Sequence, residues 1–257
     1  MLPVYSISKP FLAQAILELS LDLSTAIGEY VPGIADVYKT RTLASLLNHT
    51  SGLDDYSQLA AYNQAVTDSE RAWSASELLN RCEQLPHQRV GFQYSNIGYL
   101  LLLKAMQQTT GLGYFQSLEQ LVFQPLGISD FAEWAEPHSA IPSYDPAWVY
   151  SGTFLSAPEA IAPALAALAK HRASTLGLAA GLNEVPYPNT GFEQPGYNYG
   201  FMANGNPPTH VGHGGGGPGF QLMALVSTSN WNSDVEISLT GDLDQAKAIE
   251  ALKARLA

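Results

Sequence analysis

The spacing of apolar residues changes along the chain, and this change constrains the fold more than any other feature of the sequence. Up to about residue 170 the apolar residues recur at helical intervals. After that point, 219–229 is a continuous apolar run and 235–239 alternates between apolar and polar residues, which predicts two strands. A last stretch, 245–256, returns to helical spacing. This order predicts an α+β fold in which helices flank an antiparallel sheet, because a parallel sheet requires strands and helices to alternate.

Several helix boundaries are marked by residues that satisfy the free backbone groups of a helix end. Ser74 with Glu77, and Ser156 with Glu159, both have the spacing of a capping box. Asp242 or Asp244 is expected to cap the last helix. The predicted helices are 7–19, 43–47, 74–85, 96–109, 156–170 and 245–256. The segment from Val185 to Pro208 is rich in Tyr, Asn, Pro and Gly and is expected to be an irregular loop that borders a cleft.

Composition excludes several classes of protein. Apolar residues make up 46% of the 257, enough for a substantial core, and the formal net charge of −11 opposes binding to nucleic acid or to an anionic membrane surface. The densest apolar run, 99–103, is too short to span a bilayer. The lone Cys82 cannot form an internal disulfide and is expected to be a buried apolar residue. Residues 1–5 lack the features of a signal peptide, so the compartment is left open.

The first segment with catalytic potential is Ser6-Ile7-Ser8-Lys9, at the start of the first predicted helix. Three residues are almost one helical turn, so the Ser6 hydroxyl and the Lys9 amine are expected to share a face. An amine with a lowered pKa can accept a serine proton, and a helix N-terminus favours the developing negative charge. Taken alone, the pattern also fits a helix-capping serine followed by a solvent-exposed lysine.

The second segment is Tyr94-Ser95-Asn96, directly before the helix at 96–109. A phenol beside a lysine ammonium can ionise and act as a general base. The Asn96 amide offers both a donor and an acceptor, which suits it to orienting Lys9 or a substrate amide. The alternative is a buried aromatic residue followed by an ordinary helix cap.

The third segment is the glycine-rich run from Gly212 to Phe220, which contains His213-Gly214-Gly215-Gly216 and is expected to be a loop that leads into the following strand. Glycines allow a backbone to approach a ligand closely, and an N–H here could supply half of an oxyanion hole. A dinucleotide-binding loop would require a helix where Pro218 and a strand follow. An α/β-hydrolase would require a G-x-S-x-G motif, which the chain lacks. A zinc site at His210 and His213 lacks a third ligand, so neither metal nor cofactor is expected.

Taken together and in this order, the three segments resemble the serine β-lactamase-related family, which includes class C β-lactamases, penicillin-binding-protein carboxypeptidases and related esterases. The run Leu46-Leu47-Asn48-His49-Thr50-Ser51-Gly52-Leu53 is similar to the L-L-x-H-T-S-G-L segment of that family, in which the histidine is structural. The turn at Ser151-Gly152 and the helix that follows it also resemble the family pattern.

The resemblance implies a role for each matching residue. Ser6 would be the acylated nucleophile, Lys9 its activating partner and Tyr94 the base for acylation or deacylation. Asn96 would orient Lys9 and the substrate, and the backbone N–H groups of Ser6 and Gly216 would form the oxyanion hole. His213, Gly214 and Gly215 stand where relatives often have Lys-Thr-Gly and would border the substrate. Because a histidine is mostly neutral near pH 7, the substitution favours an esterase, amidase or peptidase over a penicillinase.

The resemblance also implies the fold and its organisation. A single domain is expected over 1–257, with a helical lobe at about 41–170 and a sheet lobe formed by about 1–40 and 200–257. The implied substrate is a small molecule or short peptide that contains an ester, an amide, a β-lactam or a D-amino acid.

The chain departs from the family pattern in having only five residues before Ser6. Relatives normally carry strands there, so we expect the N-terminal strands of the family to be missing from this chain. A nucleophile so close to a chain end could be held loosely. The alternative hypothesis is therefore a binding or regulatory module that retains the fold without turnover. The oligomeric state is left open. The protein would be cytoplasmic if Met1 is the true start, and periplasmic or secreted if the N-terminus is truncated.

Overall fold

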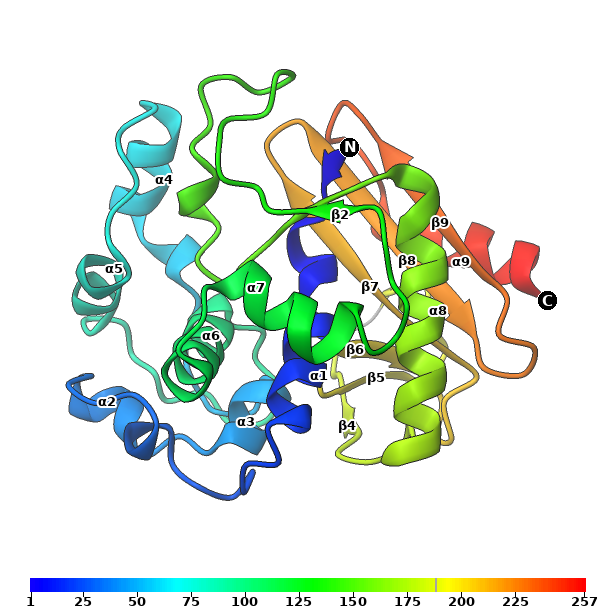
Figure 1. Cartoon of the computed structure of the whole chain (residues 1–257), viewed down its shortest axis with the longest axis horizontal. Helices are drawn as coiled ribbons and strands as arrows, with labels where there is room; N and C mark the ends of the chain where they lie inside the picture. The colour runs from blue at the N-terminus through cyan, green and yellow to red at the C-terminus, as the bar shows by residue number, and fades with distance from the viewer. Residues whose placement is uncertain (188) are drawn as a thin grey trace.

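A computed structural model describes residues 1–187 and 189–257 (Figure 1). In this described part of the chain, an antiparallel sheet has the strand order β4-β5-β6-β7-β8-β9. Its strands are β4 (Asn183–Glu184), β5 (Pro195–Asn198), β6 (Phe201–Asn204), β7 (His210–Gly217), β8 (Phe220–Ser227) and β9 (Ser233–Ser238). Each strand pairs with its neighbour in the chain, so the sheet is a meander of consecutive hairpins.

The N-terminal residues join a separate, small sheet. Strand β1 (Leu2–Pro3) pairs antiparallel with β3 (Leu155–Ser156), which also pairs with β2 (Phe131–Ala132). The backbone N–H of Val4 continues this attachment by donating to the carbonyl of Phe154 at 3.1 Å. The chain start is therefore fixed to the segment that leaves the helical part of the molecule.

Most of the helices lie on one side of the molecule and the six-stranded sheet lies on the other (Figure 1). The helices are α1 (Ser8–Glu18), α2 (Asp36–Lys39), α3 (Leu43–Leu47), α4 (Ala60–Thr67), α5 (Ala75–Cys82), α6 (Asn96–Thr110), α7 (Tyr114–Leu118), α8 (Pro158–Thr175) and α9 (Gln245–Leu256). A short 3-10 turn, η1 (Tyr5–Ile7), leads directly into α1.

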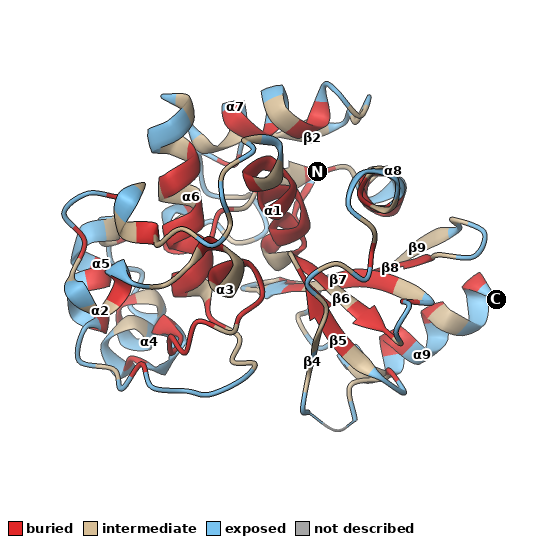
Figure 2. Ribbon diagram, turned by 90° about the horizontal axis from the view of Figure 1, so that it is seen from below, coloured by how far each residue is buried: buried red, intermediate tan, exposed pale blue. Residues whose placement is uncertain are grey.

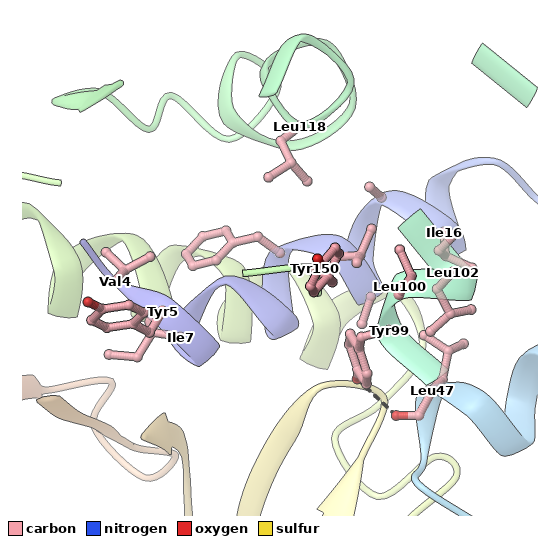
Figure 3. Close-up of a cluster of buried hydrophobic side chains, with 14 of the residues drawn as sticks. Val4, Tyr5, Ile7, Ile16, Leu47, Tyr99, Leu100, Leu102, Leu118 and Tyr150 are labelled. Carbon is pink, nitrogen blue, oxygen red and sulfur yellow. Dashed lines mark hydrogen bonds between the residues drawn. The ribbon is translucent and has the colours of Figure 1, made fainter. Parts of the chain in front are cut away.

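Helix α1 lies between the helical side and the sheet and is buried all round (Figure 2). Every residue from Ser8 to Ile16 is buried, as expected for a helix without a polar face. Phe11 packs edge to face on three other phenylalanines. The surrounding core includes Tyr99, whose hydroxyl donates to the Leu47 carbonyl at 3.0 Å (Figure 3). This central helix carries Lys9 and follows Ser6, so packing fixes the base of the candidate site.

The sheet separates two apolar cores. Along β8, Leu222, Ala224 and Val226 face the main core, whereas Met223 and Leu225 face a second core under α9. This follows from the alternation of side chains along a strand. Helices α8 and α9 both pack against β8 and β9, and they cover opposite faces of the sheet (Figure 2).

The structure confirms the α+β arrangement and most of the predicted helices, and it corrects three expectations. The segment expected to be an irregular loop contains β5 and β6; its residue 188 lies outside the described residues. The glycine-rich run is not a loop, because its residues up to Gly217 belong to β7. Ser156 does not cap α8: that helix begins at Pro158, and the Ser156 hydroxyl donates to the carbonyl of Ala157.

The other capping predictions are confirmed at Ser74 with Glu77, and at Asp244. Cys82 is buried, as expected. Helix α8 lies mostly within the range assigned to the helical lobe, yet it packs on the sheet, and the sheet itself begins at Asn183. The division of the domain into two lobes stays a prediction.

Candidate active site

The Ser6 hydroxyl lies at the start of the central helix, where η1 turns into α1. Tyr5, the preceding residue, has a φ of +46°, a conformation that costs a non-glycine residue free energy and that proteins often retain at functional sites. The Tyr5 hydroxyl donates to the Pro218 carbonyl at 2.7 Å. This bond, together with the pairing of β1, holds the turn that carries Ser6 from both sides.

The Lys9 amine lies directly beside this hydroxyl and is fully buried. Its Nζ is 3.0 Å from Ser6 Oγ, 2.7 Å from Asn96 Oδ1 and 3.2 Å from Ser151 Oγ. Burial lowers the pKa of Lys9 to about 7, and the nearby Asp55 carboxylate opposes this shift. A neutral amine has two N–H groups and one lone pair, so Lys9 can donate to Asn96 and Ser151 while it accepts the Ser6 proton.

The Tyr94 phenol lies on the other side of Ser6. Its hydroxyl donates to Ser6 Oγ at 3.1 Å, and the Lys9 Nζ is 5.1 Å from the centre of the Tyr94 ring. Burial raises the pKa of Tyr94 above its ordinary value, so the phenol is protonated at neutral pH. Burial thus opposes the ionised tyrosine that the sequence suggested, and it makes Tyr94 a proton donor in the resting site.

The beginning of α6 positions Tyr94 and Asn96. Ser95 caps this helix, and its hydroxyl also donates to the carbonyl of Asp54 at 2.9 Å. The backbone N–H of Asn96 donates to the Asp55 carboxylate. Because a helix N-terminus has free N–H groups and a partial positive charge, this carboxylate stabilises the helix end and fixes the Asn96 side chain toward Lys9.

Strand β7 approaches the turn that carries Ser6 so closely that side chains cannot fit between them. A Cβ placed on Gly215 would lie 2.2 Å from the Val4 carbonyl oxygen, and one on Gly217 would lie 2.4 Å from the Tyr5 ring. The residue between them differs, because a Cβ on Gly216 would meet nothing nearer than Gln221 Cγ at 3.6 Å. These glycines thus let the strand approach the protein's own backbone, and the contact places Gly216 beside Ser6.

His213 has hydrogen-bond partners at both ring nitrogens. Its Nδ1 is 2.6 Å from the Gly214 carbonyl oxygen, and its Nε2 is 3.2 Å from the Tyr197 hydroxyl. Burial and the nearby Lys9 charge lower the pKa of His213 to about 3. The imidazole is therefore neutral, with the proton on Nδ1.

Two chambers open on either side of Ser6, and both are bordered by Ser6 and Gly216. The larger has a volume of about 490 Å³ and is bordered by Tyr94 and by His213, Gly214 and Gly215. The smaller has a volume of about 250 Å³ and is bordered by Asn96 and Ser151. A substrate with its reactive carbon at Ser6 would extend into both.

The structure brings Ser6, Lys9, Tyr94 and Asn96 into one hydrogen-bonded group, and it places 213–216 along the wall of the larger chamber. Sequence reasoning missed Ser151 as a partner of Lys9 and Tyr197 as a partner of His213. Ser151 was visible only as part of a family-like turn, and no spacing rule connects it with Lys9, which precedes it by 142 residues.

The described residues contain no group of three or more His, Cys, Asp or Glu side chains arranged to hold a metal ion. Among the helices of that same part of the chain, none combines the length and the apolar character needed to cross a membrane.

The antiparallel sheet, the helices on its two faces and the Ser-Lys-Tyr group define a fold of the β-lactamase/transpeptidase type. The chain belongs to the beta-lactamase family, whose sequence model matches residues 1–233. This confirms the resemblance inferred from the motifs.

Individual relatives agree with this assignment. Penicillin-binding protein 4* of Bacillus subtilis (strain 168) is 31% identical in an alignment of 138 residues, which covers 49% of this chain and 29% of that protein. The match therefore spans less than a third of this curated relative.

Two solved structures have the same fold across nearly the whole chain. A D-stereospecific amidohydrolase from a Streptomyces species has a TM-score of 0.74 at 23% identity, covering 100% of this chain and 87% of that one. A D-amino acid amidase from Ochrobactrum anthropi SV3, complexed with D-phenylalanine, has a TM-score of 0.77 at 21% identity, covering 98% and 90%. At these identities the likeness establishes the fold alone.

Proposed function

We propose that the protein is a serine hydrolase that cleaves an ester or amide bond, including a peptide bond, through an acyl-enzyme at Ser6. The observation that carries the proposal is that the Ser6 hydroxyl lies within hydrogen-bond distance of a proton acceptor and of a proton donor. Ser6 Oγ lies 3.0 Å from the amine of Lys9, whose pKa is lowered to about 7, and 3.1 Å from the protonated phenol of Tyr94.

Acylation uses these groups in a defined order. The neutral Lys9 amine accepts the Ser6 proton while Oγ attacks the substrate carbonyl carbon, and the carbonyl oxygen takes the negative charge. The backbone N–H groups of Ser6 and Gly216 are the candidates to stabilise that oxyanion. Tyr94 donates its proton to the leaving alcohol or amine as the carbonyl–heteroatom bond breaks, and Lys9 replaces that proton with the one taken from Ser6.

Deacylation reverses the direction of proton transfer. The neutral Lys9 amine takes a proton from water while the water oxygen attacks the acyl carbon, and it returns that proton to Ser6 Oγ as the bond between the acyl carbon and Oγ breaks, which releases the acid and restores the Ser6 hydroxyl. The names of the structural relatives, an amidohydrolase and an amidase, favour amides among the candidate substrates. Neutral His213 supports an esterase, amidase or peptidase over a penicillinase, because it offers no positive charge to a carboxylate.

The alternative, a binding module without turnover, was motivated by the few residues before Ser6. In the structure the chain start is held by the pairing of Leu2 with Ser156 and by the Tyr5 bond to Pro218. These contacts support the catalytic interpretation, because they hold the turn that carries Ser6 in place.

A fluorophosphonate probe and the hydrolysis of para-nitrophenyl butyrate test the proposal together. We expect the probe to add to the peptide that contains Ser6, and Ser6→Ala to lose labelling and several orders of magnitude in kcat. Ser129→Ala, an exposed serine far from the site in sequence, serves as the control and should retain both. A protein that binds ligands saturably but shows no Ser6-dependent labelling or turnover would support the binding module instead.

A further inference from the structure

The two chambers beside Ser6 lack charged walls. Among the residues that the structure describes, those bordering either chamber include no Asp, Glu, Lys or Arg. Large apolar and aromatic side chains dominate the larger chamber, namely Phe92, Tyr187, Phe192, Met202, Leu222 and Leu243. Aromatic side chains also line the smaller one, namely Tyr5, Tyr56, Tyr62, Tyr144 and Trp148. The described walls around Ser6 therefore offer a substrate no charged partner.

The one histidine of the larger chamber is held neutral by a chain of hydrogen bonds behind it. Ser95 N–H donates to His49 Nδ1 at 3.1 Å, so a neutral His49 carries its proton on Nε2 and donates it to the Tyr197 hydroxyl at 3.2 Å. Tyr197 in turn donates to His213 Nε2, and His213 donates from Nδ1 to Gly214. No ring nitrogen of His213 is left to bind a charged substrate group.

The buried lysine is equally unavailable. Lys9 does not border either chamber, and its N–H groups are directed to Asn96 and Ser151. The Asp55 carboxylate is buried and accepts the backbone N–H of Asn96. The charges nearest to Ser6 are thus already engaged inside the protein and cannot pair with a charge on the substrate.

The chambers also differ in which half of a substrate they would hold. Tyr94, the proposed proton donor, borders the larger chamber and not the smaller one, and a proton donor must reach the leaving atom. The leaving group therefore enters the larger chamber. The acyl group enters the smaller chamber, where Asn96, Ser57 and Ser151 supply uncharged polar groups.

We infer that the preferred substrates carry no charge on either side of the bond that is cleaved, with an apolar leaving group in the larger chamber and a compact apolar or aromatic acyl group in the smaller one. The inference rests on the proposed function. Its physical basis is that moving a charge from water into an apolar chamber is costly unless a partner compensates it. Free α-carboxylates and free ammonium groups near the bond are thereby excluded.

Three nitrophenyl esters and one thioester test this inference in the wild-type protein. Para-nitrophenyl butyrate is neutral. Mono-para-nitrophenyl glutarate adds a carboxylate to the acyl half, the butyrate of a carboxylated nitrophenol adds one to the leaving half, and butyrylthiocholine adds a cation there. Each kcat/KM is divided by the rate with hydroxide, to remove intrinsic reactivity. We expect each charged ester to fall at least about tenfold below the neutral one.

Two variants at the chamber rims locate the halves of the substrate. Gln245 is exposed at the start of α9 and borders the larger chamber, and Ser57 is exposed and borders the smaller one. Gln245→Arg should raise the relative kcat/KM for the carboxylated leaving group about fivefold or more, and Ser57→Arg should do so for the glutarate ester. Gln245→Met and Ser57→Met, which add length without charge, should raise neither.

The outcomes separate this inference from the proposed function. If no ester is hydrolysed in a Ser6-dependent manner, the proposed function fails. If the wild-type protein hydrolyses a charged ester as fast as the neutral one, the serine hydrolase stands and the inference of an uncharged substrate is overturned. If the two arginine variants assist the opposite esters, the assignment of the chambers is reversed.

Discussion

Lys9 combines full burial with a side chain that is ordinarily charged, and this combination connects activity with pH. The pKa of Lys9 is lowered from 10.5 to about 7, mainly by loss of hydration and against the opposing charge of Asp55. Only the neutral amine can accept the Ser6 proton, so kcat/KM should rise with pH through about 7 and level off above it. The pKa of Tyr94 is raised, so no fall in activity from tyrosine ionisation is expected just above neutrality. A pH–rate profile with para-nitrophenyl butyrate checks both the rise in kcat/KM through about pH 7 and the absence of a fall just above it.

Lys9→Met is the matched variant, because methionine is similar in length and carries no charge. It should remove the activity while increasing stability by about 1–3 kcal/mol below pH 7. The sign follows from proton linkage: between pH 7 and 10.5 the unfolded chain binds the lysine proton and the folded chain does not, so the stability of the wild type rises with pH across that window. The advantage of Lys9→Met should therefore shrink toward pH 10. Urea unfolding at both pH values measures it, and an equal or lower stability of the variant at pH 6 would contradict this account.

At the scale of elements, the close contact between β7 and the turn that carries Ser6 predicts different effects of substitution at neighbouring glycines. Gly215→Ala would place a methyl group 2.2 Å from the Val4 carbonyl oxygen, so either the strand or the turn that carries Ser6 must move. We expect a loss of about 2–4 kcal/mol in stability together with a large fall in kcat.

Gly216→Ala is the control, because the added carbon has space and the backbone N–H is retained. Gly216→Ala should keep nearly full stability. Thermal unfolding and kcat, measured for Gly215→Ala and for Gly216→Ala, distinguish the two positions. Equal effects at 215 and 216 would mean that backbone flexibility, and not the contact with Val4, decides the role of these glycines.

The elements also show what the sequence could and could not reveal. Helices with regular apolar spacing and clear caps, such as α5 and α6, were predicted within a few residues, because those signals act locally. Strands β5 and β6 were missed because Pro195–Asn198 and Phe201–Asn204 contain no β-branched residue. They are strands because β6 pairs with both β5 and β7, and β7 pairs with the apolar strand β8, so pairing with the sheet and not their own composition decides their conformation.

The residues of the candidate site also fall into two groups, those that are close in sequence and those that only the fold brings together. Ser6 with Lys9, and Tyr94 with Asn96, are each close in sequence, and both pairs could be proposed from spacing. The contacts of Ser151 with Lys9 and of Tyr197 with His213 arise only when distant segments pack together. The direction of the Tyr94 pKa shift was also beyond the sequence, because it is set by burial, which outweighs the opposing effect of the hydrogen bond with Ser6.

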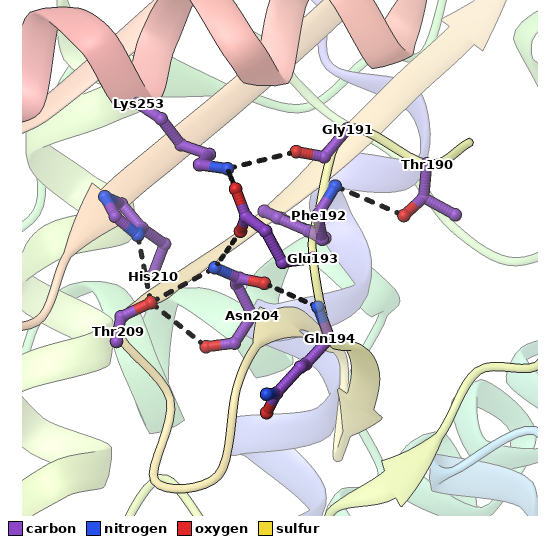
Figure 4. A network of polar contacts seen from close by, with 9 residues as sticks. All are labelled: Thr190, Gly191, Phe192, Glu193, Gln194, Asn204, Thr209, His210 and Lys253. Carbon is purple, nitrogen blue, oxygen red and sulfur yellow. Dashed lines mark hydrogen bonds and ion pairs between the residues drawn. The ribbon is translucent and has the colours of Figure 1, made fainter. Parts of the chain in front are cut away.

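At the scale of the whole molecule, the substrate chamber depends on how the second core is assembled. The segment around Phe192 borders the larger chamber and also packs in the core under α9. A polar network connects this segment to the helix: the Lys253 ammonium pairs with Glu193 and donates to the Gly191 carbonyl, and the Asn204 amide binds Glu193 at 2.8 Å (Figure 4). Helix α9 therefore supports one wall of the chamber as well as one face of the sheet.

This arrangement predicts that two buried isoleucines of equal exposure differ in their effect on catalysis. Ile249 in α9 and Ile16 in α1 are both fully buried, so Ile249→Ala and Ile16→Ala should each cost about 2–5 kcal/mol. Ile249 faces Gly191, since a Cβ there would lie 2.8 Å from the Ile249 Cβ. A cavity at Ile249 loosens the chamber wall, and we expect KM to rise severalfold with little change in kcat.

Ile16 lies in the main core near the far end of α1 from Ser6, so its truncation should lower stability and leave KM unchanged. Thermal unfolding and steady-state kinetics on a neutral ester, well below the melting temperature of either variant, provide the comparison. A rise in KM for Ile16→Ala of the same size would mean that the chamber responds to stability in general. A rise confined to Ile249→Ala would identify α9 as the support through which the second core sets substrate affinity.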